Sequence, residues 1–156
     1  MTNRVSPGPS DGHERELGQV ALPWLLRRTS QRYRIAIGER LSDRGLDELP
    51  QPGFWALMIL SRGGSDAGQL IVEMGISKQA VSKLVDALVT LGFVDRTPNA
   101  ADRRRTDLEL SAKGRKAADL IGDAVRTMDE TVARELGAER LDDLVQMLTE
   151  LSQRKL

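Results

Sequence analysis

Polar side chains begin a predicted helix near the middle of the chain, at residues 77–83 (SKQAVSK). Ser77 is suited to cap this helix, and the free N–H groups of a helix's first turn bind phosphate well. A glutamine can pair with both hydrogen-bonding groups of an adenine edge, and a lysine can reach the acceptors of guanine. These residue types at the start of a helix indicate DNA recognition, and the candidate contacts are Ser77, Lys78, Gln79, Ser82 and Lys83.

The opposite face of this helix is apolar. Its members recur at helical spacing and are Val81, Leu84, Val85, Leu88 and Leu91. Gly92 predicts the end of the helix. Taken alone, the polar strip is also typical of an ordinary solvated helix face. The preceding helix, the glycine-bearing turn and the following hairpin instead favour a helix-turn-helix, whose second helix enters the major groove.

A β-hairpin with a basic tip is predicted after this helix. Residues 93–97 (FVDRT) and 106–110 (TDLEL) are its expected strands, the second by its alternating pattern. The tip carries Arg103, Arg104 and Arg105, one of which can enter a narrow, electronegative minor groove. Asp102 can brace Arg104 or fix the turn. A solubilising loop, or a contact with an acidic protein, is the alternative interpretation of this tip.

Three helices are expected before the helix that begins at Ser77, which we call the reading helix. Residues 21–44 carry an apolar stripe and predict a long helix ending at Gly45; the stripe is Leu22, Leu26, Tyr33, Ile37 and Leu41. Pro50, Pro52 and Gly53 predict a break, followed by a short apolar helix that ends at Gly63. A third helix at residues 67–74 is expected to be capped by Ser65 or Asp66 and ended by Gly75.

Two groups of side chains in this half have more than one interpretation. We expect the aromatic residues to pack in the core, with an effector pocket as the alternative; they are Trp24, Tyr33, Phe54 and Trp55. We expect the arginines of the first helix to pair with acids of the C-terminal helices, with DNA or an anionic effector as alternatives; they are Arg27, Arg28, Arg32 and Arg34.

Two amphipathic helices are predicted at the C-terminal end. Ser111 is expected to cap the first, and Gly137 separates it from the second. The last helix carries leucines at 141, 144, 148 and 151. Such faces are not stable alone, so they must meet each other, the first helix or a second copy of the chain.

Composition excludes several classes of protein. The 156 residues contain no Cys, which excludes disulfides, thiol redox switches and thiolate metal sites, and the single His13 excludes a histidine cluster. We therefore expect no metal and no cofactor. The net charge is zero, but residues 77–116 carry 9 basic and 5 acidic side chains, whereas residues 117–156 carry 5 and 9. The basic middle agrees with a nucleic-acid partner.

The N-terminal segment has no apolar run of a secretory signal, and no run approaches a membrane span. The sequence therefore predicts a soluble, cytoplasmic protein without a membrane partner. Residues 1–12 are rich in Pro, Gly, Ser and Asp and are expected to form a disordered tail.

The segment from Gly75 to Gly114 resembles the winged helix-turn-helix of MarR-family transcriptional regulators. The resemblance rests on the Ser77 cap, the run from Val81 to Leu88, Gly92, the basic Arg96, Asp102-x-Arg104, and Leu110-Ser111-x-x-Gly114. It adds Arg96 to the candidate DNA contacts. It also gives Arg104 the role of the wing-tip arginine in the minor groove, and Asp102 the role of the aspartate that braces it.

This resemblance implies a mainly α fold with a small β-hairpin wing and a helical dimerisation domain. The implied domains are residues 13–48 and 116–156 for dimerisation and 49–115 for DNA binding. The expected interface residues are Leu26, Tyr33, Leu141, Leu144, Leu148 and Leu151. The implied function is that of a homodimeric repressor, released from a pseudo-palindromic DNA operator by a small aromatic or anionic effector.

Two other functions are alternatives to DNA binding. A winged-helix protein-interaction module without an effector would dock the arginine tip on an acidic partner. An enzyme has no support, because the sequence offers no nucleophile–base pair, phosphate loop or metal cluster.

Overall fold

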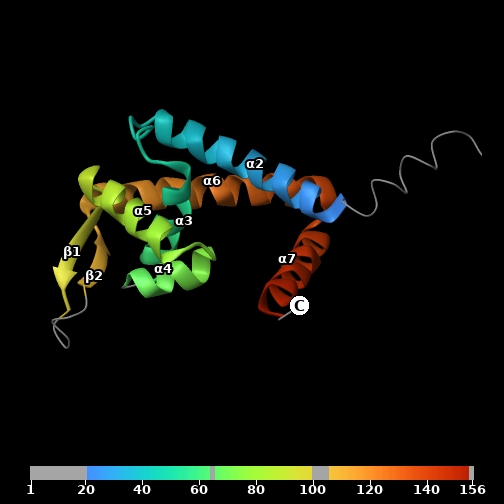
Figure 1. The fold of residues 1–156 in the computed structure, drawn as a ribbon. Coiled ribbons are helices and arrows are strands. Elements are labelled where there is room, and N and C mark those ends of the chain that lie inside the picture. Colours follow the sequence, from blue (N-terminus) through green and yellow to red (C-terminus); the bar gives the residue numbers. More distant parts are fainter. Residues whose placement is uncertain (1–20, 64–65, 100–105, 155–156) are drawn as a thin grey trace, which may run out of the picture.

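The computed structural model describes residues 21–63, 66–99 and 106–154, which form helices and one two-stranded sheet (Figure 1). The elements are α2 (Ala21–Ser42), α3 (Gln51–Ser61), α4 (Ala67–Met74), α5 (Lys78–Thr90), β1 (Val94–Pro98), β2 (Thr106–Leu110), α6 (Ala112–Leu136) and α7 (Ala138–Gln153). The predicted mainly α fold with a small hairpin is confirmed. The tail predicted at residues 1–12 and His13 lie outside the described residues.

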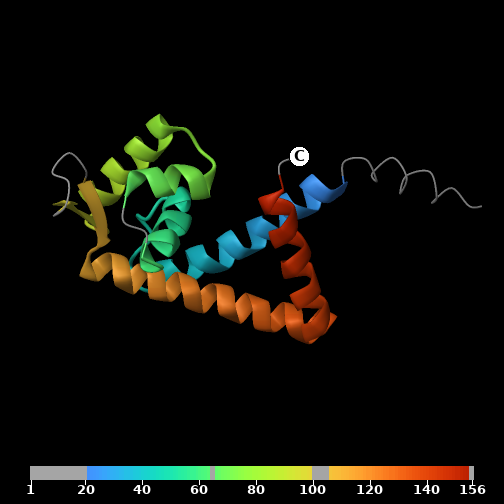
Figure 2. The same ribbon diagram turned by 90° about the horizontal axis from the view of Figure 1, so that it is seen from below.

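Helix α6 is the central helix of the fold. Helix α2 packs along it, and α3 packs against its first half. Helices α3, α4 and α5 and both strands gather at one end of α6, whereas α7 leaves from the other end (Figures 1 and 2). This arrangement places the predicted DNA-reading elements and the last helix far apart.

The predicted helix caps are confirmed. Asp66 caps α4 by accepting a hydrogen bond from the backbone N of Gln69 at 2.9 Å. Ser77 caps α5 by accepting one from Ala80 N at 3.2 Å, and Ser111 caps α6 by accepting one from Gly114 N at 3.0 Å. A serine or aspartate side chain thus marks the first turn of each of these helices.

The break predicted at Pro50, Pro52 and Gly53 is present between α2 and α3, but it ends at Pro50, so α3 begins at Gln51 rather than at Phe54. Pro50 is the N-cap of α3, and Pro52 lies in the first turn, where a missing N–H costs nothing. Gly53 is buried, and a Cβ built on it would lie 2.9 Å from Leu49 Cδ1. These residues therefore begin the helix, and the glycine allows a close approach to its neighbours.

One hydrophobic core joins the helices and the sheet. Its fully buried side chains include Ile37 of α2, Leu57 of α3, Leu88 of α5 and Ile121 of α6, together with Phe93 between α5 and β1. The expectation that the aromatic residues are core is right for Phe54 but wrong for Trp24 and Trp55, which are exposed. Trp24 lies in the first turn of α2.

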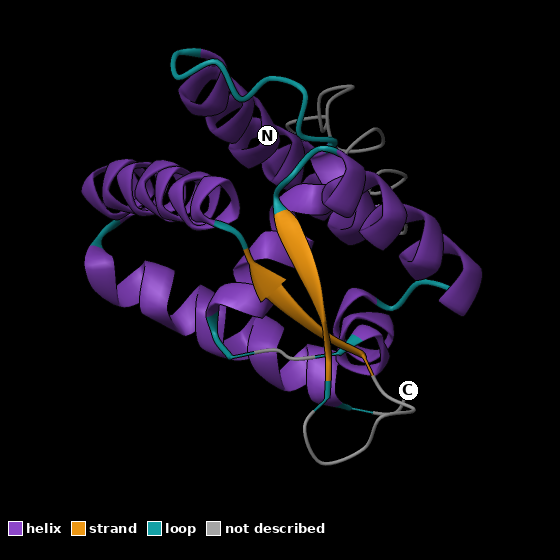
Figure 3. Cartoon of the chain, turned by 90° about the vertical axis from the view of Figure 1, so that its left-hand side faces the viewer, coloured by secondary structure: helices purple, strands orange, loops and turns teal. Residues whose placement is uncertain are grey.

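The two strands form the predicted hairpin. They pair antiparallel, with Val94 opposite Leu110 and Pro98 opposite Thr106 (Figure 3). Val94, Leu108 and Leu110 are buried, so this hairpin packs one face on the core. In the described part of the chain, no helix is long and apolar enough to span a bilayer.

Candidate nucleic-acid interface

The outer face of α5 presents the predicted DNA-contacting side chains to solvent. Ser77, Lys78, Gln79, Ser82 and Lys83 are all exposed, whereas Val81, Leu84, Val85 and Leu88 are buried. Because the buried face fixes the rotation of α5, the donors cannot turn inward without exposing the apolar residues. The structure thus brings the five predicted residues of this helix together on one free strip.

A crevice of about 680 Å³ runs between α4, α5 and the wing. Helix α5 contributes Lys78 and Ser82 to it, the start of α4 contributes Ala67 and Gly68, and the strands contribute Arg96 and Thr106. Helix N-termini and cationic side chains on neighbouring elements favour an anion. The carboxylate of Asp66, which caps α4, also lines the crevice, so Lys78 and Arg96 are the groups in it that can attract a phosphate backbone.

Arg96 connects the wing to α5. Its Nη2 atom donates a hydrogen bond to Asp86 Oδ1 at 2.6 Å, and both side chains are partly exposed. A guanidinium carries five N–H donors, so this bond leaves others for a ligand. Arg96 thus lies beside the predicted strip and is also bonded within the protein.

The end of α5 is fixed by a glycine-based cap. Gly92 has φ 75°, a left-handed conformation that glycine adopts without strain. The N–H of Phe93 donates to Leu88 O and that of Gly92 to Val89 O, both at 2.9 Å. This is the Schellman pattern. It confirms the predicted helix end and sends the chain directly into β1.

The start of α6 contacts this cap from the other side. Ser111 Oγ donates to Gly92 O at 2.6 Å, and Ser111 N donates to Phe93 O at 3.0 Å. A Cβ built on Gly114 would lie 1.9 Å from Phe93 O, so only glycine allows α6 to approach this closely. The Leu110-Ser111-x-x-Gly114 pattern is therefore a clamp that holds the reading helix to α6.

Sequence reasoning missed Lys113, which lies inside this clamp. Its ammonium donates to Leu91 O at 2.8 Å and pairs with Glu48 Oε1 at 2.6 Å. It also lies 4.3 Å from the centroid of the Phe93 ring. The sequence shows that Lys113 lies close to the predicted Ser111 cap. It does not show the contact with Glu48, because that contact depends on tertiary packing.

The predicted wing-tip residues Asp102, Arg103, Arg104 and Arg105 lie outside the described residues. The structure describes the hairpin up to Asn99 and again from Thr106. Asn99 Nδ2 donates to both carboxylate oxygens of Asp107 at 3.0 Å, which ties the two strands together beside the tip.

A second, larger cleft of about 940 Å³ lies behind α5. It is lined mainly by apolar side chains such as Trp55, Met58 and Met74, and its cationic lining residues are Arg34, Arg62 and Lys83. The buried Nε of Arg34 has no hydrogen-bond partner among the described residues. The cleft reaches from the α2–α6 pair to Lys83 of the reading helix, so it borders both parts of the molecule.

Apolar side chains are exposed at the other end of the molecule. Helix α7 has no buried residue, and Leu144 and Leu151 are 40% and 38% exposed. At the start of α2, Leu22, Leu25 and Leu26 are also exposed. Leu141 and Leu148 are half-buried. Packing within one chain therefore buries only a part of these apolar faces.

Tyr33, another predicted interface residue, is engaged within the chain. Its hydroxyl donates to Asp129 Oδ1 at 2.6 Å and so joins α2 to α6. Burial, followed by this hydrogen bond and the negative charge of Asp129, raises the pKa of Tyr33 to about 12.

The pairing predicted for the arginines of α2 with acids of the C-terminal helices is a pairing within the dimer, so it stays a prediction. Arg27, Arg28, Arg32 and Arg34 form no ion pair with any residue that the structure describes. Arg28 instead lies over the Trp24 ring at 4.6 Å.

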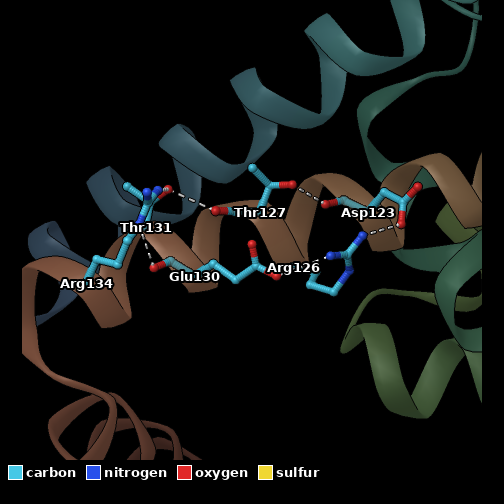
Figure 4. A network of polar contacts seen from close by, with 6 residues as sticks. All are labelled: Asp123, Arg126, Thr127, Glu130, Thr131 and Arg134. Carbon is cyan, nitrogen blue, oxygen red and sulfur yellow. Dashed lines mark hydrogen bonds and ion pairs between the residues drawn. The ribbon is translucent and has the colours of Figure 1, made fainter.

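The charged side chains on the exposed face of α6 pair with one another. Arg126 pairs with Asp123 and Glu130, each at 3.1 Å, one turn before and after it (Figure 4). The hydrogen bonds that Arg126 donates to these two carboxylates, first that to Asp123, raise the pKa of Arg126. Further contacts within the helix complete the network of Asp123, Arg126, Thr127, Glu130, Thr131 and Arg134. This face is typical of a solvated helix surface.

The fold and this interface define a winged helix-turn-helix DNA-binding protein. Residues 49–105 match the model of the MarR family. This segment resembles the DNA-binding part of MarR-family transcriptional regulators, and the chain has the fold of DNA-binding regulators of that type. Members of this family are DNA-binding proteins rather than enzymes.

Solved structures agree with this assignment across most of the chain. A transcriptional regulator from Thermotoga maritima is 26% identical, with a TM-score of 0.54, and the match covers 85% of this chain and 92% of that one. A cysteine-to-serine mutant of MarR from E. coli, complexed with operator DNA, has 21% identity, a TM-score of 0.70 and coverage of 86% and 96%.

The Bordetella bronchiseptica protein BpsR, whose DNA binding is regulated by 6-hydroxynicotinic acid, has 19% identity, a TM-score of 0.68 and coverage of 86% and 94%. The search of curated proteins found no match.

Proposed function

We propose that this protein is a homodimeric repressor that binds a pseudo-palindromic operator and is released from it by a small aromatic or anionic effector. The observation that supports DNA reading most directly is the α5 strip, where five polar side chains are exposed opposite a fully packed apolar face. The structural neighbour bound to operator DNA has the same fold. The DNA-binding part is residues 49–115, and the dimerisation part is residues 13–48 and 116–156.

The reading helix α5 is proposed to enter the major groove. Gln79, Lys78 and Lys83 then contact base edges, and Ser77 and Ser82 contact phosphates with the start of α4. Arg96 contacts the backbone from the crevice, with the donors that its bond to Asp86 leaves free. The tip arginines Arg103, Arg104 and Arg105 extend the contact into the minor groove, with Asp102 bracing Arg104.

A second copy of the chain is proposed to cover the apolar side chains of α7 and of the start of α2. The contacts within one chain leave Leu26, Leu144 and Leu151 exposed. Burying such residues stabilises association, and a two-fold axis uses each of them twice. Two α5 helices would then meet successive major grooves about 34 Å apart.

The 940 Å³ cleft is the proposed effector site. Trp55 and the methionines suit an aromatic ring, and the Nε of Arg34, which has no hydrogen-bond partner in the described part of the chain, suits an acceptor. Because the lining includes Lys83 and Leu84 of α5 as well as Arg34 of α2, a ligand there can favour one orientation of α5 over another. The neighbour regulated by 6-hydroxynicotinic acid supports a small acidic aromatic ligand.

Selection of bound duplexes from a randomised pool by the purified protein tests the proposal. We expect recovery of a two-fold-related sequence at about 150 mM salt, where non-specific binding is weak. Failure to retain any duplex would refute DNA reading and favour a protein-interaction module.

Two substitutions sharpen this test on the recovered duplex. Arg104→Ala should cost about 1–3 kcal/mol of binding free energy without changing the oligomeric state. Gln79→Ala should relax base preference more than total affinity. A uniform loss for all sequences would instead make Gln79 a phosphate contact.

A further inference from the structure

Lys113 connects three parts of the molecule that the proposed function requires to be held together. It lies in the first turn of α6, and its Nζ donates to Leu91 O, the C-cap of α5. The same ammonium pairs with Glu48, which lies in the segment between α2 and α3. One side chain therefore contacts the scaffold helix α6, the end of the reading helix and the exit from α2.

Lys113 makes three contacts at once, and its side chain and that of Glu48 are each 36% exposed. Charge-assisted hydrogen bonds are roughly twice as strong as neutral ones, and the ammonium makes two of them. The Phe93 ring at 4.3 Å adds a cation–π contact. The hydrogen bond from Lys113 is the main cause that lowers the pKa of Glu48, so the carboxylate is charged throughout the neutral range.

Apolar packing also joins α5 to the segment after α2, because Leu49 and Leu88 both lie against Gly53, but the polar bonds of the junction are few. Ser111 and Gly114 tie the Gly92–Phe93 turn to α6 only, through bonds to Gly92 O and Phe93 O. Helices α5 and α2 are separated by α3, and Glu48 is in the segment that leads into α3. Through its two polar bonds, Lys113 thus connects Glu48 in that segment to Leu91 O at the end of the reading helix.

We propose that Lys113 is a positioning residue for DNA binding: by bonding both Leu91 O and Glu48 it fixes the angle of α5 to the α2–α6 scaffold and so sets the half-site spacing that the dimer accepts. This inference rests on the proposed function. It assigns no base contact to Lys113, which is half-buried against Phe93 and outside the exposed strip of α5.

The test uses the duplex that the full-length protein recovers from the randomised pool, together with duplexes whose half-sites are one base pair closer or farther apart. Glu48→Gln removes the ion pair alone, Lys113→Met removes both polar bonds but keeps an apolar chain on Phe93, and Lys113→Arg keeps the charge. Arg126→Met breaks another ion-paired cation on α6 and serves as the control.

We expect the wild type to bind the recovered duplex more tightly than the duplexes with altered spacing. Lys113→Met should reduce this ratio of affinities about tenfold, which corresponds to about 1.4 kcal/mol. Glu48→Gln should lose part of it, Lys113→Arg should retain most of it, and Arg126→Met should not change it. Lower thermal stability with an unchanged spacing preference would show a merely structural role and overturn the inference, as would an equal loss in Arg126→Met.

A second measurement does not depend on DNA. The chain has no Cys, so a single spin label at Gln79→Cys reports the distance between the two reading helices of the free dimer. The distance distribution should broaden in Lys113→Met and Glu48→Gln relative to the parent. An unchanged distribution overturns the inference, whereas a wild type that binds no duplex overturns the proposed function instead.

Discussion

Arg96 Nη2 lies 2.6 Å from Asp86 Oδ1, so the strand β1 of the wing is bonded to the outer side of the reading helix. The two side chains are 42% and 59% exposed, and exposed ion pairs contribute only about 0–1 kcal/mol to folding. The pair therefore matters more for how the guanidinium is presented than for stability.

Substitutions on the two sides of this pair are expected to have opposite effects on DNA binding. Arg96→Gln removes a proposed phosphate contact in each protomer, so it should weaken duplex binding and reduce the slope of log affinity against log salt by about 1.8, or about 0.9 per protomer. Asp86→Asn removes a negative charge beside the DNA, so it should leave affinity equal or higher. Both are measured by titration of labelled duplex over a range of salt. Equal weakening by the two variants would contradict a direct contact and show that the pair acts by holding the wing.

The contact between Gly114 and the Phe93 carbonyl predicts a pair of opposite effects on stability. Gly114→Ala would put a Cβ 1.9 Å from Phe93 O, so α6 or the turn must shift. Overpacking of this kind costs about 1–3 kcal/mol.

Gly122→Ala is the matched control in the same helix, since nothing lies within 4 Å of its Cβ position. It should stabilise the protein by about 0.5–1 kcal/mol through helix propensity. Denaturant unfolding of both variants checks the prediction. A neutral Gly114→Ala would show that the clamp is loose.

Local chemistry explains why much of this region could be predicted from the sequence. Ser77 and Ser111 cap helices through their own first turns, and Gly92 ends α5 through bonds within six residues. The alternation in residues 106–110 gave the bounds of β2, because its faces differ in polarity. These features depend on neighbours in the chain, which a sequence displays.

Features that depend on tertiary packing could not be predicted in the same way. The bond between Lys113 and Glu48 joins residues far apart in the chain, and so does that between Tyr33 and Asp129. Gly53 was interpreted as a helix breaker because nothing local shows that Leu49 and Leu88 press against it. Trp55 was expected in the core, although it lines an open cleft instead.

The only tyrosine of the chain allows a direct test of the α2–α6 contact. Burial and the bond to Asp129 raise the pKa of Tyr33 from 10.0 to about 12. A raised folded-state pKa means that the contribution of this group to stability is complete below pH 10.0 and is lost as the pH rises through about 12.

Titration of the tyrosinate absorbance should therefore give a midpoint near 12 in the native protein. Asp129→Asn should lower that midpoint by removing the charge and weakening the hydrogen bond, and Tyr33→Phe should abolish the signal. A native midpoint at the ordinary value would mean that the hydroxyl is solvated and that α2 and α6 are not joined there.

The exposed leucines of α7 lead to a prediction about assembly. Leu144 is 40% exposed within one chain, so an aspartate there is compatible with the folded protomer. If a second copy covers this face, Leu144→Asp removes at least about 1.5 kcal/mol of apolar burial on each side of a two-fold interface, which raises the dimer dissociation constant at least about 100-fold. Val72→Asp, at an 80% exposed site on α4, is the control and should leave the dimer unchanged. Sedimentation velocity over a range of concentrations, with circular dichroism to confirm folding, measures both variants. A folded Leu144→Asp protein that remains a dimer at wild-type concentrations would place the interface elsewhere, and α7 would then be free for another partner.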